Sequence, residues 1–100
     1  MALVKVASTS ELSAGQCKVA EANGKPIALY NCAGTLYATE NTCLHRGGPL
    51  GEGSLNGTTI TCPWHGWDYD VTTGKNGFNP AVGVATFPVH VDGDDVMVDV

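Results

Sequence analysis

The sequence predicts an all-β domain, built as a small sandwich or a partly open barrel in which two long loops carry Cys and His residues. Short runs of β-branched and apolar residues alternate with polar ones, which is typical of half-buried strands. Thirteen glycines among 100 residues indicate frequent turns. No helical-period segment exceeds about two turns. One hundred residues suffice for one domain with a modest core.

The first forty residues are expected to form a β-meander. Strands are expected over 3–6, around Cys17 and Val19, and over 27–30 and 36–38, after a turn region at 8–15 with one helical turn. Asn23-Gly24 is a strong hairpin signal, and Ala33-Gly34 marks a second turn.

The second half alternates long loops with short strands. Residues 41–57 form a loop with one short strand near Ser54-Leu55, ending at the turn Asn56-Gly57. Further strands are expected at 58–61, at 67–71 and in a closing hairpin of 86–91 and 96–100 around the DGDD turn at 92–95. Loops are expected at 62–66 and 72–83, and Pro88 indicates an edge or a bulge.

Charge and hydropathy exclude some partners. Ten acidic residues against five basic ones give a net charge of −5, which argues against nucleic acid or an anionic membrane. The acidic surface suits a protein partner with a basic patch, or serves solubility alone. No apolar run approaches the ~20 residues of a membrane span, and the start MALVKVASTSELSAG lacks signal-peptide features. The expected compartment is therefore the cytoplasm, where grouped cysteines more often bind metal than form disulfides.

Two Cys/His pairs stand out. Cys43-Leu44-His45 and Cys62-Pro63-Trp64-His65 are sixteen residues apart, each in a Gly/Pro-rich loop between strands. Two such loops can converge, so four ligands can meet. Zinc is one candidate for a Cys₂His₂ set, but zinc motifs usually keep cysteines together and histidines together. One Cys and one His from each loop instead suit a two-iron cluster with unlike ends.

C-x-H followed after sixteen residues by C-x-x-H resembles the Rieske [2Fe–2S] motif. The stretch CLHRGGPLGEGSLNGTTITCPWHGWDYD is similar to soluble Rieske ferredoxins and to the Rieske domains of ring-hydroxylating oxygenases, and KPIALYNCAGTLYATENTCLH extends the likeness. The resemblance covers nearly the whole chain. It implies one Rieske domain over 1–100, with a cluster-binding subdomain at about 41–83.

By this resemblance, the protein binds one [2Fe–2S] cluster. Cys43 and Cys62 would bind the inner iron, and His45 and His65 the outer iron. The exposed edge of one of these histidines would be the exit for the electron. Imidazole ligands raise the reduction potential relative to an all-cysteine cluster.

The resemblance also implies roles for the neighbouring residues. Gly47, Gly48 and Gly66 would let backbone N–H groups approach the sulfides, and Pro63 would stiffen its loop. Leu44 and Trp64 would shield the cluster from water.

Three more residues near the motif have expected roles. Tyr69 matches a tyrosine that hydrogen-bonds a cysteine sulfur. Arg46 would offset cluster charge or touch a partner, unless it is a plain surface ion-pair residue. Pro80 falls in a third, cluster-covering loop, or else in an ordinary surface turn.

Departures from high-potential Rieske proteins predict a low potential. Those proteins have a disulfide at the positions of Gly48 and Trp64, and a hydrogen-bonding serine at the position of Trp67. Here Trp67 is expected in the core. Loss of one donor disfavours the reduced cluster, so we expect a potential of roughly −150 mV.

The remaining candidates have structural explanations. Cys17 and Cys32 are expected as small buried residues rather than as a disulfide. His90 is expected as a surface or hydrogen-bonded structural residue, and the aspartates at 92, 94 and 95 as turn residues.

The resemblance predicts a monomeric electron carrier, not an enzyme: a ferredoxin passing one electron from a flavin-dependent reductase to a terminal oxygenase that hydroxylates aromatic rings. A mononuclear-iron domain would need a second set of ligands, and only His90 is left over. Two alternatives stay open. One is a small Rieske-type subunit of a larger reductase, such as nitrite reductase; the other is a zinc-stabilised interaction module.

Overall fold

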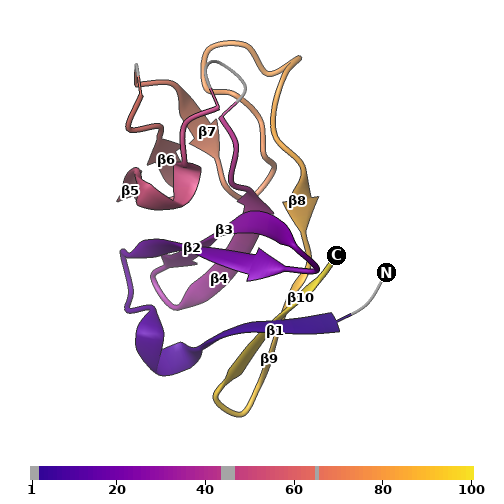
Figure 1. Ribbon diagram of the computed structural model, residues 1–100. Coiled ribbons are helices and arrows are strands. Elements are labelled where there is room, and N and C mark those ends of the chain that lie inside the picture. The colour runs from indigo at the N-terminus through magenta and orange to yellow at the C-terminus, as the bar shows by residue number, and fades with distance from the viewer. Residues whose placement is uncertain (1–2, 44–46, 65) are drawn as a thin grey trace.

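A computed structural model describes residues 3–43, 47–64 and 66–100, and its strands form three antiparallel sheets (Figure 1). The strands are β1 (Leu3–Ser8), β2 (Cys17–Ala22), β3 (Lys25–Cys32), β4 (Thr35–Glu40), β5 (Ser54–Asn56), β6 (Thr59–Thr61), β7 (Asp68–Asp70), β8 (Thr86–Phe87), β9 (Val89–Asp92) and β10 (Asp95–Asp99). Two single-turn 3₁₀ helices, η1 (Thr9–Glu11) and η2 (Leu50–Glu52), complete the described elements. Within the described residues, no helix is long and apolar enough to cross a membrane. The predicted all-β class is confirmed.

The four-stranded sheet β2-β3-β4-β8 contains the predicted meander. Asn23 and Gly24 both adopt positive φ, of 53° and 75°, as a two-residue type I′ hairpin requires. Ala33 and Gly34 repeat this with φ of 54° and 98°, and the side chain of Asn31 accepts the Gly34 N–H at 2.8 Å. Local turn chemistry therefore sets the register of these strands.

The first strand does not join the meander as expected. β1 pairs with β10, and β10 pairs with β9, in a separate sheet. Pairing with the far end of the chain lets Ala7 bury against Val96 and Val98. The expectation for β1 was wrong because its partner lies about ninety residues away, beyond the reach of local patterning. Pro88 stands between β8 and β9, the edge strands of two different sheets, as its edge preference predicted.

The third sheet, β5-β6-β7, sits on the side of the central sheet opposite the β9–β10 turn (Figure 1). Asn56 pairs with Thr59, so the turn residues are Gly57, with φ of 65°, and Thr58. The Asn-Gly signal located the hairpin, but the turn starts one residue later than expected. In the predicted alternating stretch, Tyr69 and Val71 are buried and Trp67 is half-buried.

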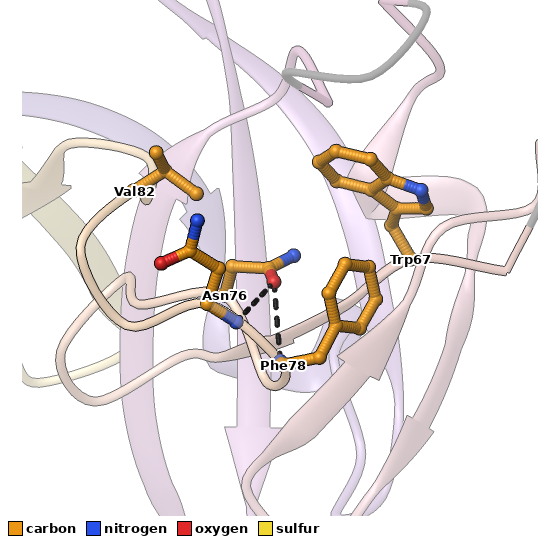
Figure 2. A pocket seen from close by; sticks show the side chains of 5 residues that line it. Trp67, Asn76, Phe78 and Val82 are labelled. Atoms are coloured by element: carbon orange, nitrogen blue, oxygen red, sulfur yellow. Dashed lines mark hydrogen bonds between the residues drawn. The ribbon is translucent and has the colours of Figure 1, made fainter.

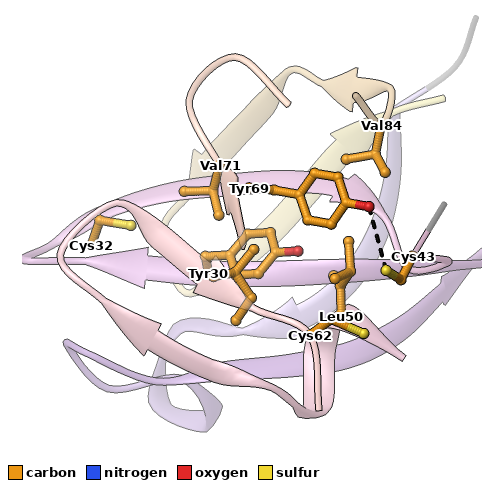
Figure 3. Close-up of a cluster of buried hydrophobic side chains, with 10 residues drawn as sticks. Tyr30, Cys32, Cys43, Leu50, Cys62, Tyr69, Val71 and Val84 are labelled. Carbon is orange, nitrogen blue, oxygen red and sulfur yellow. Dashed lines mark hydrogen bonds between the residues drawn. The ribbon is translucent and has the colours of Figure 1, made fainter. Parts of the chain in front are cut away.

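Strand β3 is buried on both faces and separates two cores. Ile27 and Leu29 join one cluster with β1 and β10, whereas Ala28 and Tyr30 join the other with residues of the third sheet. Successive side chains of a strand point to opposite faces, so one strand serves both cores. The second cluster holds the cysteines of the two candidate loops (Figure 3).

Candidate metal centre

Two loops leave β4 and β6 toward the end of the molecule opposite the β9–β10 turn (Figure 1). In the first, Asn41 accepts the N–H groups of Leu50 and Gly51 at 2.7 and 2.8 Å, through its carbonyl and its side chain. The N–H of Cys43 donates to the Gly48 carbonyl at 2.9 Å. These bonds close the loop at its base and hold Cys43 at its inner end.

The second loop is closed by one short hydrogen bond. The N–H of Cys62 donates to the carbonyl of Trp67 at 2.7 Å, directly after β6 and directly before β7. In each loop a backbone hydrogen bond therefore holds the cysteine, and both loops run between strands, as the sequence predicted.

The structure brings Cys43 and Cys62 together in one apolar cluster. Both are buried, with exposed fractions of 1% and 2%, and their thiols lie close enough to interact (Figure 3). All four cysteines of the chain are thiols, so the two are not joined by a disulfide. Burial raises the pKa of the Cys62 thiol, which the Trp64 N–H partly offsets. Two adjacent sulfur donors from separate loops fit one end of an iron–sulfur cluster.

Two groups are placed to donate hydrogen bonds to these sulfurs. The hydroxyl of Tyr69, on β7, lies 3.3 Å from the Sγ atom of Cys43. The backbone N–H of Trp64 lies 3.4 Å from the Sγ atom of Cys62 and donates to it. The first contact is the one expected for Tyr69. Such contacts tune the potential of a cluster held by these thiolates.

The expected histidine ligands, His45 and His65, lie outside the described residues, as do Leu44 and Arg46. In the described remainder of the chain, no three His, Cys, Asp or Glu side chains lie close enough together to hold a metal ion. Of the four candidate ligands, the structure therefore describes only the two cysteines.

Glycine is required in these loops for two different reasons. Gly48 is buried, and a methyl group placed on its Cα would lie 2.8 Å from Cys62 Sγ. Gly47 and Gly66 instead adopt positive φ, of 74° and 73°, which other residues rarely do. Gly48 thus packs against a cysteine sulfur, and the approach of the three N–H groups to the cluster sulfides stays a prediction.

The two tryptophans differ in position. Trp64 is 49% exposed, whereas Trp67 packs against the core cluster, as predicted. The ring of Trp67 also meets Phe78 edge-to-face, with 5.1 Å between centroids (Figure 2). Pro80 is exposed in the same 76–83 loop, and so is Pro63 in the second loop.

The sequence-based prediction missed Asn76, which anchors the 76–83 loop. Asn76 is 2% exposed, and its side chain accepts the N–H groups of Phe78 and Asn79 at 3.1 and 2.9 Å (Figure 2). It also donates to the Asp68 carbonyl at 3.2 Å. The pair Asn76-Gly77 in a Gly/Pro-rich stretch was the available signal, because Asn often bonds the backbone two residues on.

The other candidates lie away from the two ligand thiols or have structural roles. Cys32 is buried, and Cys17 is half-buried with its thiol 3.5 Å from the Gly53 carbonyl. His90 is exposed on β9. The predictions for Cys32 and His90 are confirmed, whereas Cys17 is half-buried instead of buried. The turn at 92–95 is also confirmed, and its Gly93 has a φ of 60°.

Comparison with known proteins decides the family, because the sequence pattern of the Rieske [2Fe-2S] domain matches residues 2–88. The chain belongs to the Rieske [2Fe–2S] family. The ferredoxin component of biphenyl 2,3-dioxygenase from Rhodococcus jostii (strain RHA1) is 39% identical over 99% of this chain and 94% of its own length. The naphthalene 1,2-dioxygenase ferredoxin component from Pseudomonas aeruginosa is 37% identical over 89% of this chain and 86% of its own.

Solved structures agree with this Rieske assignment. In a complex of reduced oxygenase with oxidised ferredoxin from carbazole 1,9a-dioxygenase, a chain 36% identical matches 96% of this one with a TM-score of 0.87, over 91% of its own length. The carbazole 1,9a-dioxygenase ferredoxin from Nocardioides aromaticivorans IC177 matches with a TM-score of 0.89 and 27% identity over 98% of this chain and 97% of its own. A nitrite reductase small subunit shares the fold alone, at 18% identity.

The family carries one [2Fe–2S] cluster, so the Rieske protein described here holds that cofactor rather than a structural zinc. Its relatives are the ferredoxin components of dioxygenase systems, not the catalytic subunits. The protein is accordingly an electron-transfer component and not an enzyme.

Proposed function

We propose that this Rieske protein takes one electron at a time from a flavin-dependent reductase and delivers it to a terminal oxygenase that hydroxylates aromatic rings. The main support is the pair of buried thiols of Cys43 and Cys62, which separate loops supply at one end of the molecule. The similarity to ferredoxin components of dioxygenase systems supports the choice of partner.

Each half of the ligand set is assigned a task in this proposal. Cys43 and Cys62 provide thiolates for one iron, inside the core. His45 and His65, on the same two loops, provide imidazoles for the other iron. The bound cluster supplies the chemistry, which is the reversible uptake of one electron. The proposed cluster-binding subdomain spans about 41–83 of a single domain.

The surrounding residues exclude water and stabilise negative charge. The Tyr69 hydroxyl and the Trp64 N–H are directed at the two cysteine sulfurs and favour the electron-rich state. Leu44 is proposed to shield the cluster from water, Arg46 to offset its charge or touch a partner, and Pro80 to belong to a loop that covers it. We further propose a monomer that works in the cytoplasm.

Iron and sulfide analysis with an optical spectrum tests the cofactor, and reconstitution tests the partner. We expect about two irons and two acid-labile sulfides per chain. Rapid-mixing absorbance should then show the reduced protein passing electrons to an aromatic-ring oxygenase. Colourless protein with one zinc per chain would overturn the proposal. Electron delivery only to a copurifying nitrite reductase would favour the reductase-subunit alternative.

A further inference from the structure

Gly48 and Trp64 lie in different loops and touch each other. A methyl group placed on the Gly48 Cα would lie 3.0 Å from Cγ and 3.1 Å from Cβ of Trp64. The indole therefore sits over the bare backbone of Gly48. Gly48 is buried, although half of the Trp64 side chain remains exposed.

The two residues also bond to the two ligand cysteines. The Gly48 carbonyl accepts the N–H of Cys43 at 2.9 Å, and the Trp64 N–H donates to Cys62 Sγ at 3.4 Å. Contacts therefore run from Cys43 to Gly48, across to Trp64, and from Trp64 to Cys62. Because the two thiols also lie close enough to interact, these contacts close a ring.

From this ring we infer that Trp64 is a positioning residue: its indole clamps the second loop onto Gly48 of the first and thereby sets the separation of the Cys43 and Cys62 thiols. Gly48 is the seat of the clamp, because any side chain there would push away both the indole and Cys62 Sγ. This role differs from shielding the cluster, since a shield needs only an apolar side chain on the surface. The inference rests on the proposed assignment of the two cysteines as ligands.

Two substitutions probe the clamp from opposite sides. Trp64→Ala removes the indole, and Gly48→Ala adds a methyl group where there is no room. Gly48 does not have a positive φ, so the alanine meets only steric obstruction.

Phe78→Ala is the control for Trp64→Ala, because Phe78 is at least as exposed and packs on Trp67 rather than on Gly48. Gly77→Ala is the control for Gly48→Ala, because its methyl group would make an ordinary 3.4 Å contact with Asp68.

The measurement is the rate at which an iron chelator bleaches the visible absorbance of the holoprotein. We expect Trp64→Ala and Gly48→Ala each to lose the cluster about tenfold faster than the wild type, equivalent to about 1.4 kcal/mol. Trp64→Phe should retain most of the wild-type stability, because its ring can still cover Gly48. Phe78→Ala and Gly77→Ala should stay within about twofold of the wild type.

The double variant tests whether the two residues act on one contact. Removing the indole relieves the 3.0 Å contact of the Gly48→Ala methyl group with Trp64 Cγ, whereas the contacts with Trp64 Cβ and Cys62 Sγ remain. The combined effect should therefore be smaller than the product of the single effects. Thermal unfolding of each variant identifies any general loss of stability.

Two results would overturn the clamp. One is cluster loss from Trp64→Ala at the rate of Phe78→Ala; the other is strict multiplication of the single effects in the double variant. A wild-type protein without iron or visible colour would instead overturn the proposed function, so the two failures are distinguishable.

Discussion

The hydroxyl of Tyr69 lies 3.3 Å from the Sγ atom of Cys43, and both residues are buried. Tyr69 comes from β7 and Cys43 from the loop after β4, twenty-six residues apart along the chain. The contact joins the third sheet to the proposed cluster. Since a ligand thiolate has no proton to give, the tyrosine hydroxyl is the donor when the cluster is bound.

Tyr69→Phe should therefore lower the midpoint potential. A hydrogen bond to sulfur stabilises the reduced, more negative cluster more than the oxidised one. We expect a decrease of about 60 mV, the equivalent of a tenfold change for one electron. Tyr30→Phe is a matched control, because Tyr30 is equally buried in the same cluster but bonds Thr39 at 2.9 Å. Redox titrations giving equal potentials for Tyr69→Phe and the wild type would contradict this role.

The wild-type potential should be near the low end of the Rieske range, roughly −150 mV. The reason is the position after His65-Gly66, where Trp67 packs into the core instead of presenting a hydroxyl to the cluster. A spectroelectrochemical titration measures this directly. A midpoint above about +100 mV would refute the hydrogen-bond argument.

Single cysteine variants should separate ligands from core residues. Cys43→Ala and Cys62→Ala are expected to abolish iron binding, because each removes one of two thiolates from the same iron. Cys17→Ala and Cys32→Ala should keep a full complement of iron and sulfide, with only a modest loss of stability. The iron content of each variant, measured after purification under identical conditions, distinguishes ligands from core residues. A colourless Cys32→Ala protein with the same unfolding stability as the wild type would contradict the ligand assignment.

Stability should fall at high pH because of Tyr30. Burial raises the pKa of Tyr30 well above its ordinary value of about 10. Above pH ~10 the unfolded chain loses this proton and the folded protein keeps it, so Tyr30 lowers the free energy of unfolding by about 1.4 kcal/mol per pH unit. The stabilisation is complete below the unfolded pKa and is lost as pH rises toward the folded one.

Comparison with Tyr30→Phe isolates this effect by urea unfolding. At neutral pH the variant should be about 1 kcal/mol less stable, because it loses the bond to Thr39. Above pH ~11 it should become the more stable of the two, since phenylalanine cannot ionise. Parallel stability curves from pH 9 to 12 would show that Tyr30 is not the cause.

Asn76→Ala should destabilise the 76–83 loop and the protein with it. The substitution leaves the N–H groups of Phe78 and Asn79 and the carbonyl of Asp68 without the partner they have now. We expect a loss of about 2–3 kcal/mol in the free energy of unfolding. Asn79→Ala is the control, because Asn79 is exposed and its side chain accepts only the Ala81 N–H among the described hydrogen bonds. Equal stabilities of the two variants would remove the anchoring role.

Much of this protein was predictable because its signals are local. The hairpins at Asn23-Gly24 and Ala33-Gly34 follow from residues that tolerate positive φ. The alternation of Trp67, Tyr69 and Val71 was likewise sufficient to predict which side chains of the stretch 67–71 are buried or half-buried. The spacing of the two Cys/His pairs indicated the Rieske family by resemblance.

Other features depend on pairs that only the tertiary structure brings together. These are β1 with β10, Tyr69 with Cys43, Gly48 with Trp64, and Asn76 with Asp68. By itself, the sequence determined the strands, the turns and the chemical type of the candidate ligands, because these depend on near neighbours and on residue type. Tertiary structure decided which sheet takes each end of the chain and which groups touch the cysteine sulfurs. The physical reason is that such contacts form only when distant segments pack on the two faces of β3.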